Sequence, residues 1–166
     1  MNARGFFLLA ATLAALLIAA GCGSSGGGDD EVTVQTGSLS KAEFIEKADS
    51  ICKAARTEFL AKYTSFIQAH KSEIGQGDKQ KEEALFGEVV ESVLAPNIEK
   101  QIKQISQLGA PESYASEAAV FLNILQDRLD EASANPAGLT ATPFPFKKAE
   151  DAAKKAGMAV CGESFS

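Results

Sequence analysis

Three cysteines carry the most sharply defined chemistry in this sequence. A cysteine thiol can take a lipid, pair with a second thiol as a disulfide, or ligate a metal as a thiolate. Cys22 lies directly behind an apolar run, whereas Cys52 and Cys161 lie in the chain that follows. The compartment decides among these reactions, because disulfides persist in oxidising surroundings.

The segment from Arg4 to Cys22 has the parts of a secretory signal peptide. Arg4 supplies the positive start, residues 6–20 form the apolar run, and small residues precede Cys22. This run is shorter than the roughly 20 residues that a membrane-spanning helix needs. The Ala-Ala-Gly-Cys sequence resembles a bacterial lipobox, in which the cysteine receives a diacylglycerol group through a thioether, although Ala19 stands where leucine is preferred. We therefore expect an acylated Cys22 as the mature N-terminus, and an ordinary cleaved signal peptide is the alternative.

Acylation of Cys22 leaves Cys52 and Cys161 as an even pair in an exported chain, where a disulfide is expected. The disulfide would close a loop of about 110 residues. The alternative is two separate buried thiols. A metal site is disfavoured, because no other residue near either cysteine has ligand spacing.

The titratable residues give a weaker signal. His70 is the only histidine, and Glu73 lies one helical turn beyond it. One imidazole with one carboxylate makes a poor metal or acid–base site, so we expect a helix-end histidine at the rim of the core. Carboxylates that share helix faces can bind divalent cations, but without a Glu-x-x-His motif we expect a solvated acidic surface. These clusters are Glu82/Glu83, Glu88/Glu91 and Asp127/Asp130/Glu131. No cofactor or metal is therefore expected.

Two glycine patterns around Cys22 match functional motifs in letters alone. Residues 21–26 fit G-x-G-x-x-G, and residues 23–27 fit G-x-S-x-G. Both motifs need a strand before the turn and a helix after it. A signal peptide and a glycine-rich tether flank them here, so neither a dinucleotide site nor a nucleophile elbow is expected.

Aromatic residues could form either a core or a ligand cavity. Five of them follow the apolar stripes of expected helices and are interpreted as core: Phe59, Tyr63, Phe66, Tyr114 and Phe121. Phe144 and Phe146 differ, because they lie at the end of a proline-rich loop at 135–145. We expect this pair to cap the end of the core, and an exposed contact surface is the alternative.

The chain divides into a signal peptide (1–21), a lipidated cysteine with a Gly/Ser/Asp-rich tether (22–38) and one domain (39–166). Residues 32–36 alternate like a strand but have no second strand to pair with, so they are interpreted as extended linker. A net charge of −6 argues against a nucleic-acid partner, which would require a basic face. It also leaves the acyl group as the expected contact with the membrane.

Helical periodicity fills the domain and predicts an all-α, antiparallel bundle of about four helices. The first helix starts at a capping box, Ser40 to Glu43, and ends at the glycines of 75–78. The second starts near Asp78, meets Pro96 and ends at 109–111; a kink at Pro96 is favoured over two separate helices. The third spans about 111–132 and the fourth about 146–158.

Three short blocks carry a resemblance to known proteins. Residues 40–45 read S-K-A-E-F-I, residues 48–52 read A-D-S-I-C, and residues 157–162 read G-M-A-V-C-G. They resemble a group of small actinobacterial lipoproteins with S-K-x-E-F-I…A-D-x-I-C near the start of the domain and G-x-x-x-C-G near its end. Ala156 departs from the aromatic that is common in that group. The group has no assigned activity, so the resemblance implies an exported, disulfide-linked helical domain and no chemistry.

We therefore expect a non-enzymatic lipoprotein on the extracytoplasmic face of the cell membrane, which binds or scaffolds an unknown envelope protein. The alternative is a carrier of an apolar small molecule between the helices. A cavity of several hundred Å³ lined by aromatics would favour the carrier, and a tightly packed core would argue against it. A hydrolytic enzyme is a third alternative, for which no nucleophile–base pair can be assembled.

Overall fold

Helix α1 (Lys41–Ala69) begins at the predicted capping box. The Ser40 hydroxyl accepts a hydrogen bond from the Glu43 amide at 3.3 Å, and the Ser40 amide donates to the Glu43 carboxylate at 2.9 Å. The hydrogen bonds from Ser40 lower the pKa of Glu43. The helix ends at Ala69, and an exposed turn follows in which Gly75 and Gly77 have positive φ.

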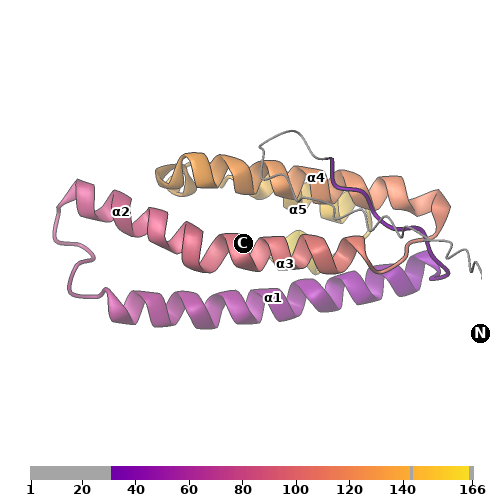
Figure 1. Ribbon diagram of the computed structural model, residues 1–166, viewed down its shortest axis with the longest axis horizontal. Helices are drawn as coiled ribbons and strands as arrows, with labels where there is room; N and C mark the ends of the chain where they lie inside the picture. The colour runs from indigo at the N-terminus through magenta and orange to yellow at the C-terminus, as the bar shows by residue number, and fades with distance from the viewer. Residues whose placement is uncertain (1–30, 143, 165–166) are drawn as a thin grey trace, which may run out of the picture.

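The computed structural model describes residues 31–142 and 144–164 and forms an antiparallel all-α bundle, as predicted (Figure 1). The predicted signal peptide (1–21) and Cys22 lie outside the described residues. Within the described ranges, no helix combines the length and the apolar character needed to cross a bilayer.

The second arm of the bundle is one kinked rod made of α2 (Lys79–Val89), the π-helix η1 (Val90–Leu94) and α3 (Ala95–Ser106) (Figure 1). Asp78 caps its start. Pro96 has no N–H to donate and its ring would clash with the carbonyl one turn earlier, and the widened π turn before it accommodates both effects. The predicted kink at Pro96 is thus confirmed.

Helix α4 (Glu112–Ala134) returns antiparallel to α3 after Gly109, which has a φ of +80°. It is followed by the 3₁₀-helix η2 (Pro136–Thr140), helix α5 (Lys147–Lys155) and the 3₁₀-turn η3 (Cys161–Glu163). Helix α3 packs against α1 and α4, and α5 packs against α4. The largest buried side chains of this core include Phe44, Tyr114, Phe121, Phe146, Ile98, Ile105, Leu122 and Leu125.

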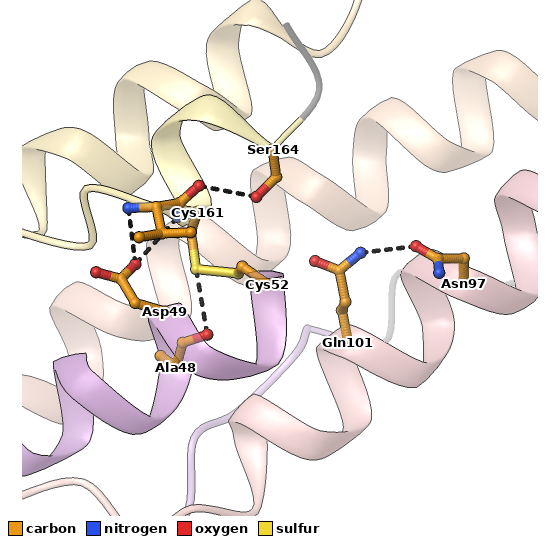
Figure 2. The surroundings of a disulfide bond; sticks show 8 residues. Ala48, Asp49, Cys52, Asn97, Gln101, Cys161 and Ser164 are labelled. Carbon is orange, nitrogen blue, oxygen red and sulfur yellow. Dashed lines mark hydrogen bonds between the residues drawn. A yellow bond between two sulfur atoms is a disulfide. The ribbon is translucent and has the colours of Figure 1, made fainter. Parts of the chain in front are cut away.

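The predicted disulfide between Cys52 and Cys161 is present and ties the C-terminal segment to the middle of α1 (Figure 2). Asp49, one turn before Cys52, accepts hydrogen bonds from the amides of Val160 and Cys161 at 3.0 Å each. These contacts fix the turn around Cys161 against α1 independently of the covalent bond.

An ion-pair cluster on the surface links α1 to α3. The Glu58 carboxylate accepts from Lys100 at 2.7 Å and contacts Lys62 at 2.9 Å. Hydrogen bonds from Lys100 and then Lys62 lower the pKa of Glu58 to about 2. The carboxylate therefore stays ionised in the folded chain at pH values where it would be protonated in the unfolded chain.

The interpretation of residues 32–36 as unpaired linker is wrong. The segment is extended but packs on the domain: the Gln35 amide donates to the Ser106 carbonyl, and the Ala110 amide donates to the Gln35 carbonyl, both at 2.8 Å. At Gly37 the backbone passes so close to Gly109 that an added Cβ would lie 2.7 Å from the Gly109 Cα. This extended segment pairs with a loop rather than a strand, which is why a search for a partner strand missed it.

Candidate apolar ligand cleft

The apolar stripe of α1 changes its role half-way along the helix. The fully buried residues of α1 are Phe44, Ala48, Cys52 and Ala55, all in its first half. From Phe59 onward the stripe continues, but its side chains are only partly buried. Among the described elements, α1 packs closely with α3 and not with α2. The far half of α1 and α2 therefore stand apart, with side chains and a cavity between them.

This cavity, which we call the cleft, has a volume of about 610 Å³. Its walls come from α1, α2, η1, the first part of α3, η2 and the segments on either side of α5. The apolar lining consists of Phe59, Leu60, Tyr63, Phe66, Ile67, Ile74, Leu85, Phe86, Val89, Leu94, Leu139, Phe144 and Phe146. The polar lining consists of Arg56, Glu82, Asn97, Gln101, Thr140 and Ser164.

The rim of the cleft exposes large apolar side chains to water. Leu60 is 51% exposed, Phe144 is 40% exposed and Tyr63 is 38% exposed. The rings of Phe59 and Tyr63 stack with centroids 5.7 Å apart, one turn from each other along α1. We call the stacked rings of Phe59 and Tyr63 the aromatic shelf; they lie between solvent and the cavity.

A pair of buried carboxamides, Asn97 and Gln101, lies in the wall formed by α3. Asn97 Nδ2 donates to the Ala55 carbonyl at 2.9 Å, and Gln101 Nε2 donates to Asn97 Oδ1 at 3.0 Å. Asn97 and Gln101 are 3% and 2% exposed, respectively. Figure 2 shows that Gln101 turns its nitrogen toward Asn97 and its oxygen away from it.

The disulfide positions the C-terminal part of the cleft wall. Ser164 lines the cleft and lies three residues beyond Cys161. Its hydroxyl donates to the Val160 carbonyl at 2.8 Å. Arg56 lines the cleft from α1 and donates to the Glu163 carbonyl at 2.9 Å. The wall therefore depends on the same turn that the Cys52–Cys161 bond holds against α1.

His70 lies at the end of α1, as expected. Its Nδ1 is 3.2 Å from Glu73 and its Nε2 is 3.6 Å from Glu88, so the ring stands between the end of α1 and α2. The Phe66 ring stacks on it at 4.3 Å. No group of three or more metal-ligating side chains occurs among the described residues. His70 and its carboxylates thus link the end of α1 to α2.

The prediction that all five stripe aromatics form core is wrong for Tyr63 and Phe66, while Phe59 packs against the core and also borders the cleft. Tyr114 and Phe121 are core residues, and the Tyr114 hydroxyl donates to the Ala156 carbonyl at 2.6 Å. Phe59, Tyr63 and Phe66 line the cleft. Helical spacing identifies an apolar face but does not reveal how far away the facing element lies.

The two loop aromatics, Phe144 and Phe146, differ in their exposure to water. Phe146 is fully buried, as a cap over the core requires, whereas Phe144 is exposed at the rim. Their ring centroids are 5.8 Å apart, and both line the cleft. The expected cap thus describes Phe146, and the alternative contact surface describes Phe144.

Two members of the acidic cluster Asp127/Asp130/Glu131 form surface contacts. Glu131 pairs with Arg128 at 2.5 Å, and Asp130 accepts from Gln126 at 2.9 Å.

Sequence reasoning missed the roles of Leu85, Asn97 and Gln101. A signal for the two carboxamides was their spacing of four residues beside an isoleucine stripe, which places them on one helix face.

Comparison with family models, curated proteins and solved structures gives no match to this chain. The resemblance to actinobacterial lipoproteins therefore stays a prediction, and the cleft itself carries the functional argument.

Proposed function

We propose that this domain binds an apolar small molecule in the cleft between α1 and α2. The observation that carries the proposal is a cavity of about 610 Å³ lined mainly by aromatic and aliphatic side chains. Small-molecule sites fall in the range of roughly 300–1,000 Å³ and combine an apolar lining with a few polar groups that orient the ligand. The cleft has both features.

The exposed rim supports the same proposal. Leu60, Tyr63 and Phe144 keep large apolar areas in contact with water, which forgoes hydrophobic stabilisation of about 25 cal/mol for each Å². A ligand lying against these three side chains would remove that area from water. The apolar ligand would then fill the space between α2 and the half of α1 from Phe59 onward.

We further propose that the domain is carried by a lipoprotein, anchored through acylated Cys22 on the extracytoplasmic face of the membrane. The disulfide supports export, because such bonds are rare in reducing compartments. A binding role is proposed rather than a catalytic one. In support, the Ser164 hydroxyl donates to a backbone carbonyl and not to a general base.

An uncharged dye whose fluorescence rises in apolar surroundings, N-phenylnaphthylamine, tests the proposal. The full chain with Cys22→Ser is used, so that no protein-linked acyl group competes. We expect saturable binding, and at least a tenfold loss of affinity in Leu60→Asp, because a carboxylate at the rim would have to lose water when the dye enters.

Val120→Asp is the matched control, because Val120 is 55% exposed on α4 and does not line the cleft. This variant should bind the dye as the parent does. Equal weakening by both substitutions, or dye uptake that does not saturate, would show that the cleft is not the binding site.

A further inference from the structure

The carboxamide pair in the cleft wall holds a buried acceptor without a partner. Gln101 Oε1 is inaccessible to water and accepts no hydrogen bond from any described residue. A buried polar atom left in this way costs about 1–3 kcal/mol relative to a satisfied one. Gln101 also lines the cleft, so a movement of its side chain toward the cleft would let a ligand there supply the missing donor.

The surrounding hydrogen bonds fix which atom of Gln101 is left over. The Ala55 carbonyl can only accept, so Asn97 must present its NH₂ group to it. Asn97 Oδ1 is then an acceptor, so Gln101 must present its own NH₂ group to that oxygen. The atom of Gln101 without a partner is therefore its oxygen. The Ala55 carbonyl, through Asn97, determines the orientation of both carboxamides.

We infer that the ligand is an uncharged, long-chain molecule with a hydrogen-bond donor at one end, of the primary-alcohol class, whose hydroxyl donates to Gln101 Oε1. This inference rests on the proposed function and specifies its ligand. The apolar chain lies along the aromatic shelf of Phe59 and Tyr63. The hydroxyl enters beside the disulfide, where the side chain of Gln101 adjusts to receive it.

The charges around the site argue against an anionic head group. A carboxylate has no proton to donate to Gln101 Oε1 and would meet the negative end of that carboxamide dipole. Arg56 already donates to the Glu163 carbonyl, and Glu82 adds a negative charge to the lining. The chain as a whole carries a net charge of −6. An uncharged donor meets none of these obstacles.

Displacement of N-phenylnaphthylamine by three molecules with the same chain tests the inference: decanol, its methyl ether and decanoate. The full chain with Cys22→Ser is used. We expect decanol to bind about tenfold more tightly than the ether, because the ether leaves the Gln101 oxygen unpaired. Decanoate should bind more weakly than decanol.

Gln101→Met removes the Gln101 acceptor but also takes the donor from Asn97 Oδ1, so the double variant Asn97→Leu and Gln101→Met is used, which leaves no side-chain acceptor of this pair. It should lower decanol affinity to that of the ether and leave ether affinity unchanged. Leu85→Ala removes apolar wall and should weaken both ligands equally. Thermal melting checks that each variant is folded, and the comparison of ligands in the parent chain needs no variant.

The outcomes separate the two proposals. Equal, saturable binding of decanol and ether by the parent chain would overturn the inference and leave the proposed function intact. Tighter binding of decanoate than decanol would also overturn it, in favour of an anion held by Arg56. If the dye binds saturably but none of the three molecules displaces it, the inference fails and the proposed function stands. If the dye itself does not bind, both fail.

Discussion

Removal of the disulfide by the double substitution Cys52→Ala and Cys161→Ala should lower the free energy of unfolding by about 4–5 kcal/mol. The bond joins residues 109 positions apart. Cross-linking a loop of that length lowers the entropy of the unfolded chain by an amount equivalent to about 4.8 kcal/mol at room temperature. For a domain of this size the loss corresponds to a melting temperature about 15 °C lower.

Urea denaturation followed by circular dichroism measures this loss, and reduction of the parent chain should reproduce it. Asp49→Ala is the informative control, because it keeps the disulfide but removes the acceptor of the Val160 and Cys161 amides. This variant should lose about 1–3 kcal/mol. If the double variant loses no more than Asp49→Ala, loop closure does not stabilise the domain and the reasoning is refuted.

Three further predictions concern separate parts of the chain. Cys22→Ala should move the protein from the membrane fraction to the soluble fraction of cells; retention in the membrane fraction would argue against the lipid anchor. The pKa of Glu58 is lowered to about 2 in the folded chain, below the usual 4.5. Its contribution to stability is therefore complete above about 4.5 and is lost as the pH falls toward 2, so the difference in unfolding free energy between the parent and Glu58→Gln should narrow over that range in urea titrations. Gly37→Ala should destabilise by about 1–3 kcal/mol because its Cβ would meet the Gly109 backbone; Gly87→Ala, in open space within α2, should instead raise stability by up to about 1 kcal/mol in the same assay.

Local chemistry made several elements predictable from the sequence. The capping box at Ser40 specifies a helix start through hydrogen bonds between residues three apart, so no distant contact is needed. Pro96 specifies a distortion through its own missing N–H and ring. The Cys52–Cys161 bond followed from counting cysteines in a chain predicted to be exported. Each of these inferences depends on bonding rules that act within a few residues or on covalent chemistry.

The cleft could not be predicted in the same way, because it depends on the distance between elements. Phe59 and Tyr114 occupy equivalent apolar positions on their helices, yet one lines the cleft and the other is buried in the core. The difference arises because α3 packs against α1, whereas α2, which precedes the π turn at Val90–Leu94, diverges from α1. The docking of residues 32–36 was missed for a related reason, since its partner is the loop at Ala110.

The position of the two bonded cysteines also determines what a protease can release. The turn between α1 and α2 is exposed and contains Gly75 and Gly77 in left-handed conformations, which makes it accessible to cleavage. A single cut there separates a fragment containing Cys52 from one containing Cys161, and the disulfide keeps the two joined. The nicked protein would migrate as one band without reductant and as two bands with it. Such a cut would free the distal ends of α1 and α2 from each other, while the core around the disulfide stays assembled.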